Sequence, residues 1–376
     1  MLSRAVRVRR QPPQASRPRR LLGQDCAGPC GTIEAPPVAG FDIPPTIIAE
    51  MGVNGTSLRW PKITVVVLNW NGLSDTLNAL ASLSNLTYPN YDVVVVDNGS
   101  DGDDAHILRR RFGDRVHLLE NEENYGFAEG NNIAVRYALA ELQPEYVALL
   151  NNDAIVDRNW LTELVRPFLA DGERDIAVAS PTIVDYFRPH RIRFGNDSRV
   201  SVFGQVRHSQ DQSPRAEIRT ITGASFVIRS DVLRSLDEFF CPEYFAYYED
   251  TDLSWRLTNL GYRLVHAPAS IVAHKESASV RGDTTRARIA VLKTRNKYLT
   301  FYRNLSLAKY ALILPILLGY DIALMIGVAL FRRDLGFAKA KIMGISESFR
   351  ALRKVQHVGG GGFSYLDKRL YLDKLG

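Results

Sequence analysis

Three apolar segments of this chain each stop abruptly in polar residues, and this pattern restricts the folds that the chain can adopt. The segments are ITVVVLNWNG at 63–72, YDVVVVDNGSDG at 91–102 and EYVALLNND at 145–153. Continuous runs of Val, Ile and Leu are typical of parallel strands that are buried on both faces. Because ligands of open parallel sheets bind beyond the carboxyl ends of the strands, we expect the three polar ends to converge on one site.

Helical patterns separate these predicted strands. Residues 73–83 carry leucines at spacings of three and four, and residues 103–112 show a similar pattern. Strands that alternate with helices predict an α/β fold, with a mostly parallel central sheet flanked by helices. A dinucleotide oxidoreductase would share this alternation. The turn after the first strand, however, reads NWNGLS instead of GxGxxG, which argues against that class.

Two later segments also carry candidate site residues. NYGFAEGNN at 124–132 places two glycines at the start of a helix expected to run to Leu142, and such an opening lets backbone amides approach a ligand. YFAYYEDTDLSWRL at 244–257 holds three carboxylates within four residues. Acidic residues also favour the positive end of a helix dipole, so a plain helix start is the simpler explanation of this cluster.

The net charge of +6 is concentrated in three segments of the chain. Residues 1–20 contain seven arginines and no acidic residue, and 281–310 and 332–354 are also basic. This pattern favours a membrane surface or an anionic ligand over nucleic acid, for which we would expect basic stripes interleaved with aromatic residues. The three cysteines form neither a disulfide framework nor a zinc motif, and they suit a reducing compartment.

Residues 310–331 form a long apolar stretch with Asp321 as its single charge. A helix of this length could cross the hydrocarbon layer of about 30 Å. Pro315 and Gly319 interrupt the stretch near its middle, so a re-entrant or interfacial hairpin fits at least as well. A buried helix that packs on the sheet is a third interpretation. Basic residues flank both ends, so their distribution selects no orientation in a membrane.

Seven segments, taken in order, resemble those of family 2 glycosyltransferases, and within that family most of all bacterial rhamnosyltransferases. They are VVVLNWNG, VVDNGSDG, NYGFAEGNN, LLNNDAIV, TGASFVIR, YYEDTDLSWR and SIVAHKES. The resemblance covers residues 63 to about 275 and rests on the order of the segments. It implies the GT-A nucleotide-diphospho-sugar transferase fold and the transfer of a sugar from a nucleoside-diphosphate donor.

The resemblance also assigns donor-binding roles to individual residues. Trp70 and Asp97 would contact the nucleotide base, with Asp97 accepting from the imide N–H of a uracil or thymine. The ribose and phosphates would be lined by Asn124, Gly126 and Asn131, with Asn152 nearby. Gly223 and Ala224 would border the donor sugar. Among donors, dTDP-rhamnose is expected first, with a UDP-hexose close behind.

A divalent cation is implied by the same resemblance. Asp153 and His274 would hold Mg²⁺ or Mn²⁺ together with diphosphate oxygens. Many members of the family carry Asp-x-Asp where this chain has Asn151, Asn152 and Asp153, which leaves one anionic ligand instead of two. This departure keeps open a second hypothesis, in which the protein is a catalytically silent sugar-nucleotide-binding subunit of a membrane glycan-assembly complex.

Catalysis is assigned to the acidic cluster. Asp250 would take the proton from the acceptor hydroxyl in a single displacement that inverts the anomeric carbon, with Glu249 and Asp252 in support. Carboxylates this close together raise one another's pKa, although the sequence does not show which of the three is affected.

Together these inferences predict three parts of the chain. They are a disordered Arg/Pro-rich tail at 1–58, a GT-A catalytic domain at 59–280 and a helical, membrane-associated region at 281–376. The tail lacks the apolar core of a secretory signal, so export is not predicted. We expect the protein at the cytoplasmic face of the cell membrane, peripheral or with one re-entrant or transmembrane segment. Its acceptor would be a lipid-linked or growing saccharide in cell-surface glycan synthesis, such as a cell wall polysaccharide.

Overall fold

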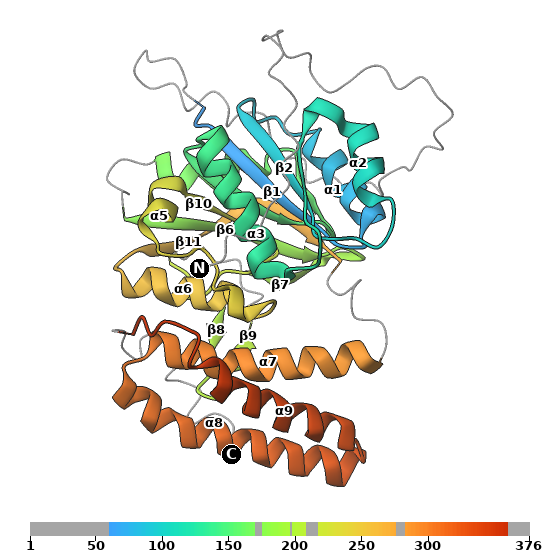
Figure 1. Cartoon of the computed structure of the whole chain (residues 1–376). Helices are drawn as coiled ribbons and strands as arrows, with labels where there is room; N and C mark the ends of the chain where they lie inside the picture. Colours follow the sequence, from blue (N-terminus) through green and yellow to red (C-terminus); the bar gives the residue numbers. More distant parts are fainter. Residues whose placement is uncertain (1–59, 170–174, 196–197, 208–216, 276–282, 360–376) are drawn as a thin grey trace.

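A mixed β-sheet with the strand order β3-β2-β1-β4-β10-β6-β11-β5 forms the centre of the molecule (Figure 1). The computed structural model describes residues 60–169, 175–195, 198–207, 217–275 and 283–359. The strands are β1 (Ile63–Asn69), β2 (Tyr91–Asp97), β3 (His117–Glu120), β4 (Tyr146–Asn151), β5 (Ala154–Val156), β6 (Ile176–Asp185), β7 (Arg188–Phe194), β10 (Ser225–Arg229) and β11 (Arg263–His274). Strand β7 pairs with β6, and the short strands β8 (Arg199–Val200) and β9 (Val206–Arg207) pair with each other.

The four strands β3, β2, β1 and β4 run parallel, as the apolar runs predict. Their register aligns Asn69 with Asp97 and Leu68 with Asn151, so the polar residues at the ends of β1, β2 and β4 are neighbours. Strand β10 enters antiparallel between β4 and β6, and β11 is parallel to β6 but antiparallel to β5. The beginning of β10 therefore lies beside the carboxyl end of β4.

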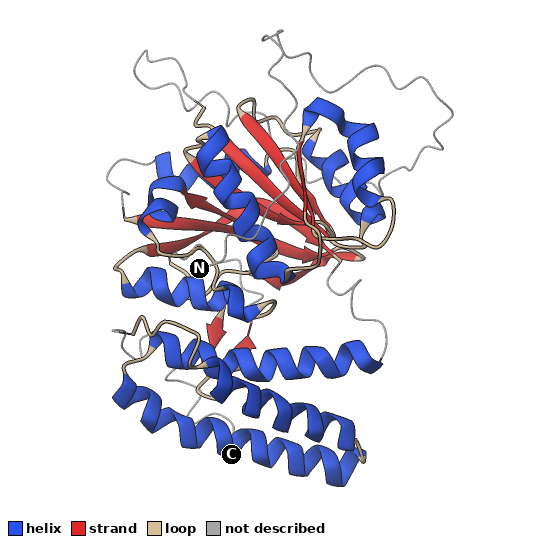
Figure 2. Cartoon of the chain, in the orientation of Figure 1, coloured by secondary structure: helices blue, strands red, loops and turns tan. Residues whose placement is uncertain are grey.

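Helices pack against both faces of this sheet (Figure 2). They are α1 (Leu73–Leu83), α2 (Asp104–Phe112), α3 (Gly126–Tyr137), α4 (Trp160–Val165), α5 (Ser230–Ser235) and α6 (Glu249–Asn259). The amphipathic helix predicted within 73–86 is found as α1, which ends at Leu83, and a π-helical turn, Ala138–Leu142, continues α3 to the expected end. Helix α3 packs on β1 and β2, and α4 packs on β11.

Three further helices form a layer beyond α6, called here the C-terminal layer (Figure 1). They are α7 (Asp283–Asn304), α8 (Leu307–Arg332) and α9 (Leu335–Ala351). Helix α8 continues unbroken through Pro315 and Gly319, so the hairpin expected within this stretch is not formed. A proline inside a helix removes one backbone hydrogen bond, and a long helix packed along its neighbours tolerates this loss.

The interior of the C-terminal layer contains a charged cluster as well as apolar side chains. Asp321 of α8 is fully buried and accepts hydrogen bonds from Lys297 Nζ at 2.7 Å, Tyr298 Oη at 2.8 Å and Lys341 Nζ at 3.0 Å. Burial alone would raise the pKa of Asp321, but the charges of Lys297 and Lys341 hold it below its usual range. Through these hydrogen bonds and ion pairs, Asp321 connects α8 to α7 and to α9.

The three parts predicted for the chain are resolved only in outline. The tail at 1–58 lies outside the described residues, and so does the predicted boundary between 280 and 281. The sheet and its helices lie within the predicted range 59–280 and the C-terminal layer within 281–376, and the division itself stays a prediction.

Candidate active site

A chain of side-chain hydrogen bonds joins the carboxyl ends of β1, β2 and β4. Asn69 Nδ2 donates to Asp97 Oδ1 at 2.8 Å, and Asn69 Oδ1 accepts from Thr76 Oγ1 at 2.6 Å. Thr76 Oγ1 in turn accepts from Asn152 Nδ2 at 3.1 Å. The three polar strand ends thus meet at one edge of the sheet. Asn69 and Thr76 were not among the predicted site residues, although Asn69 precedes Trp70 within the NWNG segment.

Asp97 and Trp70 lie at this edge in different surroundings. Asp97 is nearly buried, and its carboxylate also accepts from Ser100 Oγ at 2.7 Å. Trp70 follows β1 and is 45% exposed, unlike the buried tryptophans Trp160 and Trp255. A large aromatic ring left in solvent at a strand end is available for stacking on a planar ligand, whereas a core residue is not.

The start of α3 is tied to the turn that follows β2. Asn98 Nδ2 donates to Asn124 Oδ1 at 3.0 Å and to the Gly126 carbonyl at 3.1 Å, and Asn124 Oδ1 accepts from Gly126 N at 2.8 Å. Gly126 has φ +82°, and a Cβ there would lie 2.5 Å from the carbonyl oxygen of Phe245. Only glycine fits this position. Asn131 is buried one turn into the helix, where its Nδ2 donates to the Phe127 carbonyl at 2.8 Å.

Asp153 and His274 form a pair, although 121 positions separate them in the chain. His274 Nε2 lies 2.9 Å from Asp153 Oδ1, and Asn151 Nδ2 lies 3.4 Å from the same nitrogen. The pairing of β11 with β5 sets His274 opposite Ala154, and Lys275 N donates to the Asp153 carbonyl at 3.1 Å. The pairing of these strands therefore places the two side chains next to each other.

These two side chains fit a divalent cation as a partial set of ligands. An imidazole nitrogen and a carboxylate oxygen are donors that Mn²⁺ accepts readily, and Mg²⁺ commonly takes only one or two carboxylates together with substrate phosphates. Throughout the described residues, no three His, Cys, Asp or Glu side chains group into a complete metal site. Asp153 and His274 could therefore hold a cation as two of its several ligands.

Asp250 reaches the same edge through the segment that leads into β10. Its Oδ2 accepts from the backbone N–H of Gly223 at 2.8 Å, and the carbonyl of the next residue, Ala224, accepts from Asn151 N at 2.9 Å. A Cβ on Gly223 would lie 3.5 Å from the Asp250 carboxylate. Asp250 is therefore linked through Gly223 and Ala224 to Asn151, two residues before Asp153.

The two other carboxylates of the cluster are buried, with opposite effects on their protonation. Burial, and then the negative charge of Asp250, raises the pKa of Glu249 well above its usual value. Burial alone would also raise the pKa of Asp252, but Arg256 and Arg303 hold it below its usual range. Asp252 accepts from Arg256 Nε at 2.8 Å and from Arg303 Nε at 3.0 Å. Its carboxylate thus connects α6 to α7, while Asp250 is the one at the edge of the sheet.

Comparison with known proteins agrees with this arrangement. Residues 64–237 match the model of glycosyl transferase family 2. The chain is 27% identical over 226 residues to the pre-mycofactocin glycosyltransferase of Mycobacterium tuberculosis, a match that covers 58% of this chain and 44% of that protein. It is also 27% identical over 208 residues to the dTDP-rhamnosyl transferase RfbF of Shigella flexneri, covering 54% and 65% of the two chains. The chain spans less than two thirds of the length of both relatives.

A solved structure shows the same fold. The crystal structure of GalNAc-T7 with UDP, GalNAc and Mn²⁺ superposes with a TM-score of 0.53 at 18% sequence identity, over 67% of this chain and 50% of that chain. The sheet with parallel β3-β2-β1-β4, the ordered motifs and the family match together define a GT-A glycosyltransferase domain. Residues 64–237 are similar to glycosyl transferase family 2, and the resemblance inferred from the motifs is confirmed.

Proposed function

We propose that this protein is an inverting glycosyltransferase that moves a sugar from a nucleoside-diphosphate donor to a lipid-linked or growing saccharide in cell-surface glycan synthesis. One observation supports this most directly. The Asp153–His274 pair and Asp250 come from distant parts of the chain, yet they meet around the end of β4 and the start of β10. A sugar diphosphate and its acceptor need both groups, one beside the leaving phosphates and one beside the attacking hydroxyl.

In this proposal the donor lies along the polar edge of the sheet. Trp70 stacks on the base and Asp97 accepts from its imide N–H, while Asn124, Gly126, Asn131 and Asn152 line the ribose and phosphates. We propose dTDP-rhamnose as the donor because the chain is similar to a dTDP-rhamnosyl transferase, and a UDP-hexose as the second candidate donor. Gly223 and Ala224 border the sugar, where a larger side chain than glycine would meet Asp250.

The cation would be held by Asp153 and His274. When bound, a divalent ion stabilises the negative charge that grows on the leaving diphosphate. The neutral side chains of Asn151 and Asn152 add no charge to this site, so the protein alone binds the cation weakly and the donor phosphates complete its ligands.

Asp250 is the proposed base. The acceptor hydroxyl gives its proton to the Asp250 carboxylate while its oxygen forms a bond to the anomeric carbon, and the bond from that carbon to the diphosphate oxygen breaks. A single displacement of this kind inverts the anomeric centre. Hydrogen bonds orient this carboxylate through both oxygens: Oδ2 accepts from Gly223 N, and Oδ1 accepts from Thr251 N at 2.6 Å and from Thr251 Oγ1 at 3.2 Å. Glu249 and Asp252 support this residue from the buried side.

The decisive experiment is a panel of nucleotide sugars, including dTDP-rhamnose and UDP-hexoses, scored for release of the nucleoside diphosphate with and without Mg²⁺ or Mn²⁺. We expect release from one donor class, abolished by EDTA and restored by the cation. The departure from Asp-x-Asp at 151–153 favours a second candidate, a silent sugar-nucleotide-binding subunit. Donor binding without release under every cation and saccharide acceptor would support that alternative and contradict the proposed enzyme.

The C-terminal layer supports a location at the cytoplasmic face of the membrane. By length and composition, Leu307–Phe331 is the one segment in the described part of the chain apolar enough to span a membrane, and only 17% of its most apolar window is buried. Its exposed side chains include Leu312, Ile316, Ile322, Ile326 and Leu330. Exposed cations lie on the neighbouring turn and helix at Arg333, Lys339, Arg350, Arg353 and Lys354. Apolar side chains beside cations suit a surface of anionic lipid.

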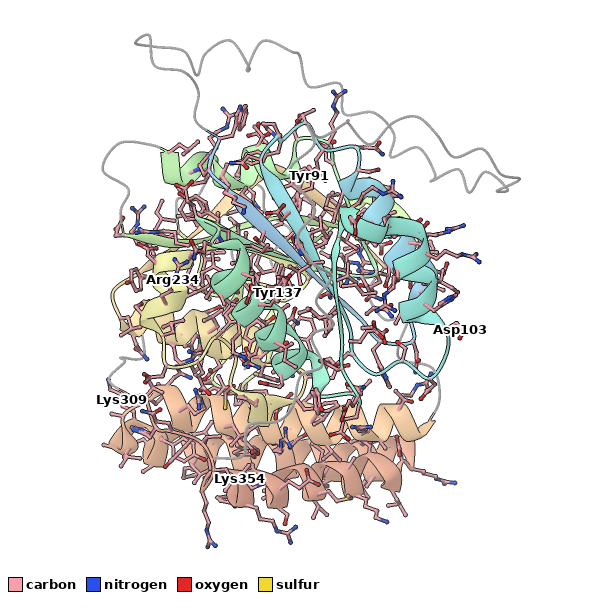
Figure 3. The ribbon with its side chains drawn as sticks, turned by 45° about the horizontal axis from the view of Figure 1, so that its top comes forward. Tyr91, Asp103, Tyr137, Arg234, Lys309 and Lys354 are labelled. Carbon is pink, nitrogen blue, oxygen red and sulfur yellow. The ribbon has the colours of Figure 1, made fainter. Side chains whose placement is uncertain are left out.

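We place α8 in the plane of the membrane surface instead of across it. Asp321 lies near the middle of α8, and spanning would require it to leave Lys297 and Lys341 or to carry α7 and α9 with it into the hydrocarbon. Figure 3 shows Lys309 and Lys354 on this layer, with Tyr91, the first residue of β2, toward the opposite end of the molecule. The carboxyl ends of the strands thus face the layer that would touch the membrane, which brings a lipid-linked acceptor to the site.

A further inference from the structure

The segment that leads into the acidic cluster has an unusual backbone. Phe245, Tyr247 and Tyr248 have φ values of 61°, 73° and 72°, and none of them is glycine. Residues with side chains adopt this left-handed region rarely, at a cost of about 1–3 kcal/mol each, and such strain persists only where surrounding groups enforce it. The next residues are Glu249 and Asp250, so the strained segment, called here the aromatic loop (residues 244–248), directly determines where the proposed base points.

A buried side-chain amide on α7 contacts the aromatic loop. Asn296 of α7 is fully buried, and the two hydrogens of its Nδ2 are shared among the carbonyls of Tyr244 at 2.9 Å, Ala246 at 2.8 Å and Tyr247 at 2.7 Å. Three carbonyls that converge on one amide are possible only when the chain between them curls tightly. The left-handed residues produce this tight turn, and the hydrogen bonds to the Asn296 amide offset the strain of the left-handed backbone.

Other side chains of α7 also contact the aromatic loop. The Arg288 guanidinium lies 5.0 Å from the centre of the Phe245 ring, and Lys293 Nζ lies 4.8 Å from the centre of the Tyr247 ring. Cations over aromatic rings at these distances are attractive, but at exposed sites each contributes only about 0.5–1 kcal/mol. Arg295 Nη2 also donates to the Tyr244 carbonyl at 3.0 Å, but it reaches no other carbonyl of residues 244–248. The buried Asn296 amide contacts three of them, so Asn296 is the main constraint.

The far side of the aromatic loop rests on the donor-binding part of the sheet. The Phe245 carbonyl accepts from Ala128 N at 3.0 Å, and its ring and carbonyl occupy the space over Gly126 at the start of α3. The loop thus connects α7, the α3 start that is proposed to face the phosphates, and the α6 start that carries Asp250.

We propose that Asn296 is a positioning residue for the glycosyl transfer: it fixes the aromatic loop and thereby sets the orientation of Asp250 toward the acceptor. This inference rests on the proposed function. It assigns part of the catalytic geometry to a helix outside residues 64–237, where the family model matches. Asn296 touches no substrate, and it acts through the backbone that precedes Glu249.

The test replaces Asn296 with Leu, which has similar size and no N–H to donate. We expect Asn296→Leu to lower kcat by about 100-fold, because a misplacement of about 1 Å at a reacting group costs that much, while the donor KM stays close to its original value. Leu305→Ala is the control for lost stability. Leu305 is fully buried in the C-terminal layer near Trp255 and Phe301, and its truncation leaves a cavity that does not touch the aromatic loop. Its kcat should remain close to that of the unaltered protein.

A second measurement does not depend on activity. In Asn296→Leu, hydrogen exchange of the amides at 245–252 should speed up selectively, whereas Leu305→Ala should leave these amides protected relative to the rest of α6. Unchanged kcat in folded Asn296→Leu, or unchanged exchange at 245–252, would overturn the inference. Absence of any transfer by the unaltered protein would instead refute the proposed function, and the exchange experiment would still decide whether Asn296 holds the loop.

Discussion

The three carboxylates at the start of α6 share one short segment but have different tasks. Asp252 is enclosed by two arginines, Glu249 is buried beside Asp250, and Asp250 alone accepts from the backbone at the edge of the sheet. The proximity of the three acids was visible in the sequence. Their division of roles was not, because it depends on Arg303 and Gly223, which lie 51 and 27 positions from their partners.

The proposed base is tested by Asp250→Asn. The amide keeps an oxygen that can accept from Gly223 N, so the fold and donor binding should persist, but it cannot take a proton. We expect kcat to fall by about 10²–10⁴-fold, the usual contribution of a general base. Steady-state kinetics with the best donor of the panel measures this. Asp231→Asn, on the exposed start of α5, serves as a control, and turnover similar in both variants would remove Asp250 from the mechanism.

The pKa of Glu249 predicts how stability depends on pH. Because burial raises this pKa in the folded protein, protonated Glu249 contributes stability that is fully present below its ordinary pKa and is lost as pH rises toward the folded value. Glu249→Gln resembles the protonated form at every pH. Its free energy of unfolding should therefore exceed that of the unaltered protein increasingly above pH 5, with a slope of at most about 1.4 kcal/mol per pH unit. Urea denaturation between pH 5 and 8 should show the two curves diverging, and parallel curves would contradict this prediction.

Among the secondary-structure elements, the junction of α6 and α7 depends on a buried ion pair. Arg303 Nε donates to Asp252 Oδ1 at 3.0 Å, and Asn304 Nδ2 donates to the same oxygen at 2.8 Å. Breaking a buried pair usually costs about 3–5 kcal/mol, and because Arg256 remains paired with Asp252 we expect the loss of Arg303 to cost the lower end of this range. Arg303→Leu should lower the free energy of unfolding by this amount in chemical denaturation. Arg350→Leu, an exposed position on α9, should change it little, and equal effects would show that the pair is not important.

The all-parallel half of the sheet could be predicted from the sequence, whereas the mixed half formed by β10, β6, β11 and β5 could not. Strands β1, β2 and β4 are continuous apolar runs that end in polar turns, and this local pattern is sufficient. Strand β11 contains Pro268 and an irregularity between Ala267 and Ile271, so its twelve residues show no continuous pattern. Strand β6 runs over ten buried residues, and its length is set by the covering of both its faces, which no local sequence signal shows.

The candidate site shows the same limit. Asp97 ends β2, and Trp70 and Asp153 come shortly after β1 and β4, so local reasoning together with the family resemblance can propose them as site residues. Asn296 has no such signal. Its three partner carbonyls lie 49 to 52 positions away in the chain. The left-handed residues of the aromatic loop are phenylalanine and tyrosine, and only glycine at these positions would have indicated a left-handed backbone from the sequence.

For the whole molecule, the proposed contact with lipid can be tested through α8. Full burial of one isoleucine side chain is worth about 1.5–3 kcal/mol, so Ile316→Asp and Ile326→Asp should each weaken binding to anionic vesicles about 10-fold or more. Sedimentation with phosphatidylglycerol-containing vesicles measures this, and His106→Asp on the exposed face of α2 is the control. An alkaline carbonate wash should release the protein from membranes. Retention after the wash would contradict a helix lying in the surface plane.

Two successive residues of α7 are bound in different directions: Asn296 is bound to the aromatic loop and Lys297 to Asp321 of α8. Truncating the chain before α7, in order to remove the apolar C-terminal layer and obtain a soluble protein, would therefore also remove Asn296. Such a shortened protein would retain Trp70, Asp97, Asp153 and His274 but lack Asn296. It could still bind a nucleotide sugar but would not transfer the sugar to an acceptor. A structure of the shortened protein would then be misread as that of a sugar-nucleotide-binding protein without catalytic activity.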